Sequence, residues 1–497
     1  MVWRRQPACG IPTTEPSMQR PGNILHFYSQ NYEHYLAGVA PGGGGSTPKA
    51  LWAHYKLCRY HSVLGEQATH HHWRSHFSRA VSAAACGNET LMHAALEEME
   101  GVNPSPRIRH ELATSLAAFA PCTSLIVLAG EPHSVLKSAL LEKTGEDQHA
   151  ISILTGNHTA EGSEDQAEGI LLRSNLLAKT GKEKLKYLNN YLARFKLDPL
   201  TLVEGGALMP CPQTLHSPEP LRHFNGPLVS VIVATYNGAS RLEAALRSLL
   251  NQTYRPIEII VIDDCSTDNT ADVVRHLQAQ HDCIRYRRLT ANVGPYVAKN
   301  LGMKLALGPF VTCHDSDDWS HPRKITAQMA PLLRNRSLVA TASRWVRLDD
   351  AGKAYARSTY PLRRLNPSSI LFRKDEVSSR IGLWDSSRTG GDSEFLARIK
   401  AVFGRKRVRV LAAPLAFGAH RSGSLMTSQT TGMDTGPMNP ERLAYWQAWS
   451  DWHITTIRDQ KILKMPEPSA ARPFRIPIQL ENSPLHLSLA LKSVDEN

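Results

Sequence analysis

From about residue 226, the sequence alternates between short apolar runs and helical patterns, and this alternation limits the possible folds strongly. The runs at 228–234 and 257–262 are continuous and rich in Val and Ile, as in strands that are buried on both faces. A helical pattern follows each run. A short strand is also expected at 284–288, and an apolar run at 309–313 continues the order. Strands and helices that alternate at this spacing form a wound βαβ sheet. We therefore expect an α/β domain built on a mostly parallel sheet.

Polar segments follow three of these predicted strands, at residues 235–238, 263–266 and 314–318. Ligands of wound sheets bind outside the carboxyl ends of the strands. The three segments should therefore line one crevice.

Three carboxylates crowd into the last segment, those of Asp315, Asp317 and Asp318. Their repulsion raises at least one pKa unless a cation or hydrogen bonds neutralise them. A hard divalent ion, bound through oxygen ligands together with a phosphate, would resolve the repulsion. A solvated acidic turn that caps the next helix, with Asp318 or Ser320 as N-cap, is the alternative. The residues alone leave both interpretations open.

A chain of 497 residues is too long for one typical core, and its composition changes along its length. Residues 1–50 are rich in Pro and Gly, which is typical of a flexible leader and linker. Residues 51–205 show helical periodicity and predict an all-α domain. A helix pair within it is similar to a tetratricopeptide unit, but the repeat of about 34 residues is absent. The α/β domain spans 226–425, and a C-terminal helix and Pro-rich tail span 426–497.

The formal net charge of +12 indicates an anionic partner. Nucleic acid is disfavoured, because no helix-turn-helix, zinc-finger or aromatic RNA-binding pattern accompanies the charge. An anionic membrane surface and a phosphorylated substrate fit it, and a solvated basic face is the alternative. Part of the excess lies in a stretch without acidic residues, which contains Arg398, Lys400, Arg405, Lys406, Arg407, Arg409 and Arg421.

Aromatic residues cluster on a predicted helix near the C-terminus, at Tyr445, Trp446, Trp449 and Trp452. Packing against the α/β domain explains them, and a glycan-stacking or membrane-interface patch is the functional alternative. Eight cysteines are scattered without paired spacing, which favours a reducing compartment. No signal-peptide pattern and no run of 18 apolar residues occurs. We therefore expect a soluble, cytoplasmic protein.

Two stretches carry a family resemblance: VSVIVATYNGASRLEAALRSLLNQTYRPIEIIVIDDCSTDNT and, further on, NVGPYVAKNLGMKLALGPFVTCHDSDDW. Together they resemble the nucleotide-binding half of a family 2 glycosyltransferase of GT-A fold. The similarity covers about residues 226–425 and consists of four motifs in family-like order and spacing. The dinucleotide pattern GxGxxG is absent, which argues against a dehydrogenase on the same kind of sheet.

The resemblance assigns donor-binding roles to several residues. Thr235, Tyr236 and Asn237 look like the segment that holds the nucleotide base. Asp263 or Asp264 resembles the carboxylate that accepts the uracil N–H, although turn capping is an alternative for one of them. A loop and helix start that contact the nucleotide are implied at Asn292, Gly294, Lys299 and Asn300. The family more often has Arg where this chain has Lys299, so a bidentate contact becomes a point charge.

The resemblance also implies the metal and the base. Asp315 and Asp317 correspond to the family's DxD pair, with Asp317 as the better ligand of Mn²⁺ or Mg²⁺ and Asp315 on the ribose or the metal. Asp318 is a candidate for a supporting or helix-capping role. The acidic base motif usually reads Glu-Asp, but Gly391 replaces the Glu here. Asp392 is then the expected base, with Glu394 as a close alternative and helix capping by Asp392 as the non-catalytic explanation.

A later loop resembles the one that closes over the diphosphate. It places Arg421 on phosphate oxygens and His420 as a third metal ligand or a second diphosphate contact. A surface loop without a ligand is the alternative.

These observations predict an inverting, metal-dependent glycosyltransferase with a helical N-terminal domain. The expected donor is a nucleotide sugar, a UDP-sugar above all, and the acceptor is a glycan or lipid-linked saccharide of cell-surface polysaccharide synthesis. The enzyme would work in the cytoplasm, with peripheral contact to the inner face of the membrane and a protein partner on the helical domain. The alternative is a helical interaction protein whose transferase domain is inactive. A nucleotidyltransferase is less favoured, because residues 235–238 do not form a Gly-rich basic loop.

Overall fold

The computed structural model describes residues 26, 28–39, 47–66, 71–132, 134–156, 164–205, 208–218, 222–428, 432–433 and 436–495. Much of the expected leader and linker of residues 1–50 lies outside these ranges. Within it, however, α2 (Tyr32–Ala37) is a packed helix with Tyr35 and Leu36 buried, which the leader interpretation did not anticipate.

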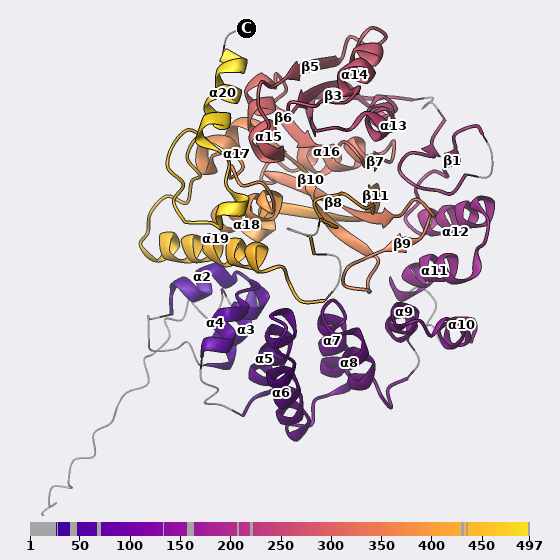
Figure 1. Cartoon of the computed structure of the whole chain (residues 1–497), viewed down its shortest axis with the longest axis vertical. Coiled ribbons are helices and arrows are strands. Elements are labelled where there is room, and N and C mark those ends of the chain that lie inside the picture. The colour runs from indigo at the N-terminus through magenta and orange to yellow at the C-terminus, as the bar shows by residue number, and fades with distance from the viewer. Residues whose placement is uncertain are drawn as a thin grey trace, which may run out of the picture.

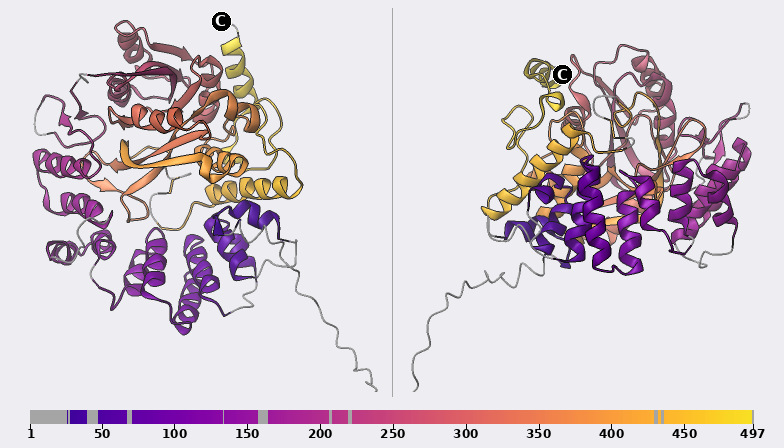
Figure 2. Two further views of the ribbon diagram at one scale, coloured as in Figure 1. Left: turned by 180° about the vertical axis from the view of Figure 1, so that it is seen from behind. Right: turned by 60° about the horizontal axis from the view of Figure 1, so that its bottom comes forward.

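Helices fill the first part of the described chain, as the periodicity predicted, and lie in an arc along one side of the sheet (Figures 1 and 2). After α2 they are α3 (Pro48–Lys56), α4 (Tyr60–Gly65), α5 (Trp73–Ala85), α6 (Glu89–Gly101), α7 (Pro106–Leu116), α8 (Pro121–Val127), α9 (Val135–Thr144), α10 (Asp147–Thr155), α11 (Glu164–Leu177) and α12 (Gly181–Ala193). The predicted helix pair is α11 and α12. Thr180 and Glu183 form a reciprocal capping box at the start of α12, which fixes the turn between them.

Among the described residues, nine strands form one mixed sheet in the order β5-β4-β3-β6-β10-β8-β11-β7, with β9 paired to β8. They are β3 (Phe224–Thr235), β4 (Tyr254–Asp263), β5 (Ile284–Arg288), β6 (Phe310–Cys313), β7 (Trp319–Ser320), β8 (Ala340–Leu348), β9 (Ala354–Tyr355), β10 (Arg363–Arg373) and β11 (Val408–Ala419). A separate pair, β1 (Thr201–Leu202) and β2 (Leu215–His216), is antiparallel.

The α/β class is confirmed, and the direction of the strands changes across the sheet. Strands β5, β4, β3 and β6 are parallel, because a helix connects each consecutive pair. Beyond β6, β10 runs antiparallel to both of its neighbours, and β8 and β11 are again parallel. The expected mostly parallel sheet therefore describes the first half, and the second half is mixed.

Helices cover both faces of the sheet, so β3 alternates between two cores. Val231 packs on the side of α13 (Ala239–Leu250), α14 (Thr270–Gln278) and α16 (Lys324–Arg334), whereas Ile232 packs on the side of α15 (Gly294–Leu305). The latter side also holds α17 (Lys374–Ile381), α18 (Gly391–Phe403) and part of α20 (Pro484–Asp495). No helix of the described residues combines the length and apolar character that crossing a membrane requires.

The helical arc shares its cores with the rest of the chain. Leu171 and Leu188 of the α11–α12 pair pack with Val346 of β8, and α19 (Pro440–Arg458) lies beside α2 (Figure 1). Glu168 of α11 is buried and accepts hydrogen bonds from the backbone N–H groups of Leu362 (2.6 Å) and Arg363 (3.2 Å) near β10. The proposed domain boundaries thus separate parts that support one another.

Replacing Glu168 with Ala should lower the free energy of unfolding by about 1–3 kcal/mol, because two buried N–H groups lose their acceptor. Urea unfolding of the whole chain measures this change. Glu97→Ala, at an exposed position of α6, is the matched control and should leave the midpoint within error. Equal midpoints for the two variants would show that the helices and the sheet do not support each other through Glu168.

Candidate active site

The ends of β3, β4 and β6 meet at one edge of the sheet, as the polar segments predicted. The N–H of Asp264 donates to the carbonyl of Thr235 at 2.8 Å, and the N–H of Asn237 donates to the Ser266 hydroxyl at 2.9 Å. The parallel register aligns Thr235 with Asp263. The segments after β3 and β4 therefore form a continuous surface.

The three residues predicted to hold the base differ in exposure. Thr235 is buried, whereas the Tyr236 side chain is 52% exposed and its ring is open to stacking. Asn237 has a positive φ of 48°, and its side-chain oxygen accepts the N–H of Thr267 at 2.8 Å. Asn237 thus shapes the loop, and Tyr236 offers the contact surface.

Asp263 and Asp264 are both buried, and each is held by the protein itself. Asp263 accepts the N–H of Ser266 at 2.8 Å, which is the turn-capping geometry considered above, and the Tyr286 hydroxyl at 2.6 Å.

Asp264 caps the N-terminus of α15. Its two carboxylate oxygens accept the N–H groups of Val293 (2.7 Å) and Gly294 (2.8 Å), and Gly294 adopts a φ of +78°. Burial raises the pKa of Asp264 to about 6, against the lowering effect of these two donors. Asn292 donates to the Asp264 carbonyl at 3.1 Å and accepts from Arg388. This loop is therefore rigid where the resemblance places the nucleotide.

The Lys299 side chain joins two of the predicted site elements. Its ammonium lies 2.9 and 3.1 Å from the carboxylate oxygens of Asp392 and 3.5 Å from Asp315, and the side chain is 2% exposed. Although burial lowers it, the carboxylates of Asp392 and Asp315 hold the pKa of Lys299 well above its usual value. The segment after β6 and the first turn of α18 thus meet around the Lys299 ammonium.

The two base candidates differ in their surroundings. Asp392 lies in the first turn of α18 and accepts a hydrogen bond from the Trp384 indole N–H at 3.0 Å. Burial raises its pKa, against the lowering effect of Lys299. Glu394 is fully buried instead and is paired with Arg398 (2.8 Å) and His453 (3.0 Å). We interpret Glu394 as structural, because its side chain is fully enclosed, whereas the Asp392 side chain is 13% exposed.

Asn300 was predicted to contact the nucleotide, and its geometry argues against that role. It is buried, and its amide donates to the Trp384 carbonyl at 2.8 Å and accepts the Trp384 N–H at 3.0 Å. Both ends of the amide are therefore used. Asn300 positions Trp384, which in turn donates to Asp392.

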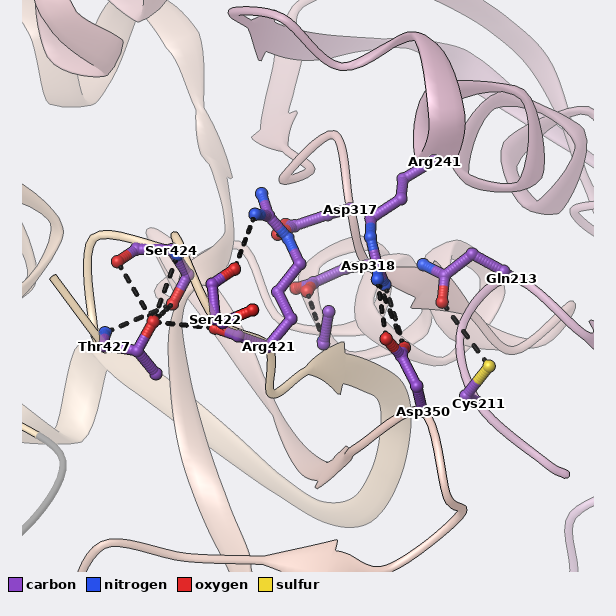
Figure 3. Close-up of polar contacts among 11 residues, drawn as sticks. Cys211, Gln213, Arg241, Asp317, Asp318, Asp350, Arg421, Ser422, Ser424 and Thr427 are labelled. Atoms are coloured by element: carbon purple, nitrogen blue, oxygen red, sulfur yellow. Dashed lines mark hydrogen bonds and ion pairs between the residues drawn. The ribbon is translucent and has the colours of Figure 1, made fainter.

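The three carboxylates at the end of β6 have different partners. Asp315 accepts a hydrogen bond from the Ser368 hydroxyl at 2.8 Å, in addition to its contact with Lys299. Asp317 forms an ion pair with Arg421 at 3.0 Å, in the loop after β11 (Figure 3).

Asp318 is buried and accepts the N–H of Ala419 at 3.2 Å. Burial and the neighbouring carboxylates of Asp315 and Asp317 hold its pKa well above the usual range. Asp318 therefore joins β6 to β11, whereas Asp315 and Asp317 are 37% and 24% exposed.

His420 does not join these carboxylates in a cation site. Its ring stacks on Tyr355 with a centroid distance of 3.7 Å and an interplanar angle of 9°. The described residues contain no group of three or more His, Cys, Asp or Glu side chains that could hold a metal. Asp315 and Asp317 are nevertheless the oxygen ligands that Mg²⁺ and Mn²⁺ take, in sites that a substrate phosphate completes.

Several side chains at the site were not singled out from the sequence. Ser368 contacts Asp315, Tyr286 contacts Asp263, and Arg241 pairs with Asp350 at 2.9 Å near the acidic cluster (Figure 3). Ser368 and Tyr286 belong to no short motif, and only the pairing of strands brings them to the site. Arg241 lies within the stretch that carries the family resemblance, but its partner Asp350 is 109 residues away.

Residues 230–384 match the model of the family described as glycosyl transferase family 2. A Haemophilus influenzae protein, named as an uncharacterized glycosyltransferase, is 34% identical over 129 residues, which are 26% of this chain and 51% of that protein. A Campylobacter jejuni protein named GalNAc(5)-diNAcBac-PP-undecaprenol beta-1,3-glucosyltransferase is 47% identical over 18% of this chain and 30% of its own length. An Escherichia coli protein named UDP-Glc:alpha-D-GlcNAc-diphosphoundecaprenol beta-1,3-glucosyltransferase is 38% identical over 20% and 40%, respectively.

The chain thus spans at most about half the length of these curated relatives. Among solved structures, S. aureus TarS 1-349 in complex with UDP-GlcNAc is similar at 21% identity, over 47% of this chain and 70% of that chain, with a TM-score of 0.37. A likeness at this score carries no argument about individual residues.

Replacing Lys299 with Met should lower the free energy of unfolding by about 3–5 kcal/mol, because two carboxylates lose a buried cation. The double variant Lys299→Met/Asp392→Asn should lose less than Lys299→Met alone, since it leaves one uncompensated charge fewer. Lys304→Met, on the exposed face of the same helix, is the control. Urea unfolding measures all three, and an equal loss in the single and double variants would contradict the ion pair.

Proposed function

We propose that this chain is an inverting, metal-dependent glycosyltransferase of family 2. Two observations support the proposal: residues 230–384 match the model of that family, and they contribute to the mixed α/β sheet described above. It moves a sugar from a nucleotide donor to a glycan or lipid-linked acceptor. The observation that carries the proposal is the Lys299 contact, which brings Asp315 of the donor side and Asp392 of the base helix to one point.

The names of the relatives support the substrate classes. The Escherichia coli relative is named for UDP-Glc as donor. The Escherichia coli and Campylobacter jejuni relatives are both named for undecaprenol-linked acceptors. We therefore propose a UDP-sugar and a lipid-linked saccharide of cell-surface polysaccharide synthesis. The net charge of +12 suits work in the cytoplasm at an anionic membrane surface. The helical arc is the proposed surface for a protein partner.

On the donor side, Tyr236 offers a ring to the base, and Arg421 offers a guanidinium to the diphosphate. Asp315 and Asp317 would hold Mn²⁺ or Mg²⁺. When bound, the ion neutralises negative charge on the departing diphosphate. Arg421, now paired with Asp317, is close enough to exchange the carboxylate for a phosphate oxygen.

On the acceptor side, Asp392 takes the proton of the attacking hydroxyl. Inversion requires this hydroxyl to approach the anomeric carbon opposite the diphosphate, and a carboxylate within hydrogen-bond reach can accept its proton. Lys299 favours the ionised form of Asp392, and Trp384 fixes its orientation by a hydrogen bond. These two neighbours keep the base charged and in place.

A panel of UDP-sugars with Mn²⁺ tests this proposal. We expect transfer or slow hydrolysis of one donor. Asp392→Asn should lower kcat by about 10²–10⁴-fold. Asp317→Ala should abolish the activity that Mn²⁺ supports. Asp282→Asn, an exposed carboxylate before β5, should leave the rate unchanged. Inactivity on every donor without UDP binding would favour the interaction protein with an inactive transferase domain.

The pH profile tests the base separately. A base works when ionised, so activity should be present above the raised pKa of Asp392 and lost as the pH falls through it. Trp384→Phe removes a hydrogen bond that lowers this pKa. The ascending limb of kcat/KM should therefore move up by about 0.5–1 pH unit. Trp52→Phe, in the helical arc, is the control, and an unshifted limb in Trp384→Phe would remove Asp392 from the role of base.

A further inference from the structure

A cavity of about 310 Å³ lies where the helical arc meets the sheet domain. Residues of α2 and α3 line one side of it, and residues of α18 and α19 line the other side. Figure 1 shows these four helices in the same region of the molecule. The cavity volume lies at the lower end of the range of about 300–1,000 Å³ that small-molecule sites occupy. The family model matches residues 230–384, so the four helices that line the cavity all lie outside that match.

The cavity combines an apolar interior with cations. Leu57, Leu396 and the indole of Trp446 supply apolar surface, and Lys400 and Arg405 supply positive charge. Such a lining suits a ligand that is part apolar and part anionic.

The ion pairs within the basic stretch of residues 398–421 show which of its cations have carboxylate partners and which do not. Most of its arginines have carboxylate partners: Arg398 pairs with Glu394, Arg407 with Glu376, and Arg421 with Asp317.

By contrast, Lys400 forms no hydrogen bond or ion pair with the part of the chain that the structure describes. Arg405 contacts an amide oxygen, that of Gln30, at 3.5 Å. Burial and the neighbouring charge of Arg405 lower the pKa of Lys400 to about 8. The carboxylate of Glu33, which also lines the cavity, acts in the opposite direction. An anion placed between Lys400 and Arg405 would relieve their repulsion.

The cavity also borders the candidate active site. Ser393, which lines it, follows Asp392 on α18, and Pro367, which also lines it, precedes the Asp315 partner Ser368. The cavity therefore lies against the first turn of α18, which also carries the proposed base, and against the segment of β10 that holds Ser368.

We propose that this cavity binds an organic phosphate that carries an apolar chain, as the phosphate-bearing end of the acceptor. The assignment to the acceptor rests on the proposed function, whereas binding itself does not. The Lys400 and Arg405 side chains hold the phosphate oxygens by charge-assisted hydrogen bonds. The apolar chain lies against Leu57, Leu396 and Trp446.

Farnesyl diphosphate, titrated into the full chain and followed by calorimetry, is the test probe. We expect binding that Lys400→Ala/Arg405→Ala weakens by about tenfold or more. Lys406→Ala, an exposed cation next to Arg405 that does not line the cavity, should bind like the unmodified chain. Arg405→Ala alone, at an exposed position, gives the same direction of change if the double variant fails to fold.

Two competitors separate the sources of the anion. Saturating UDP should leave farnesyl diphosphate binding intact, and Asp317→Ala should retain it, because the two sites are distinct. Farnesol should bind more weakly than farnesyl diphosphate, since it lacks the anion. Displacement by UDP, equal affinity for inorganic diphosphate, or no binding of farnesyl diphosphate would each overturn the proposal. If the unmodified chain binds farnesyl diphosphate but not UDP, the proposed donor site is refuted and the proposed cavity site is supported.

Discussion

The buried Lys299 ammonium is the contact on which the candidate site depends. It lies on α15, and its two partners lie at the end of β6 and at the start of α18. Without a cation between them, Asp315 and Asp392 would repel each other in a setting of low dielectric. The Lys299 side chain therefore allows the segment after β6 and the start of α18 to lie close together. A lysine in place of the more usual arginine is no loss in this position, because a compact charge fits between two carboxylates.

The remaining charges of the site are separated by their partners. Asp318 is buried against the backbone at the end of β11, whereas Asp315 and Asp317 stay within reach of solvent and of mobile ligands. Electrostatic repulsion that looked like one problem in the sequence is thus resolved in three different ways. This separation gives Asp318 a structural role and leaves Asp315 and Asp317 accessible for the ligand-binding role proposed for them.

The sequence predicted the elements near the site well, and predicted their partners poorly. The strand at residues 284–288 is β5 to the residue, because the alternation of Ile284 and Tyr286 with arginines is a local pattern. Lys299 and Asp392, however, are 93 residues apart, and no periodicity links them. Glu394 and Asn300 looked equivalent to functional residues until burial and the direction of their hydrogen bonds were known. Charge pairing across long separations depends on strand order, which the mixed half of the sheet made unpredictable.

The packing of α2 against α19 also bears on how the protein is made. Tyr35 and Leu36 share a hydrophobic core with Leu443 and Ile454, and Arg458 donates to the Leu36 carbonyl at 3.2 Å. These partners are roughly 400 residues apart, so at about 5–20 residues per second the ribosome needs on the order of 20–80 s to supply the C-terminal members of this core. The first helices must therefore leave the ribosome with an apolar face uncovered, which makes them a natural substrate for chaperones during synthesis.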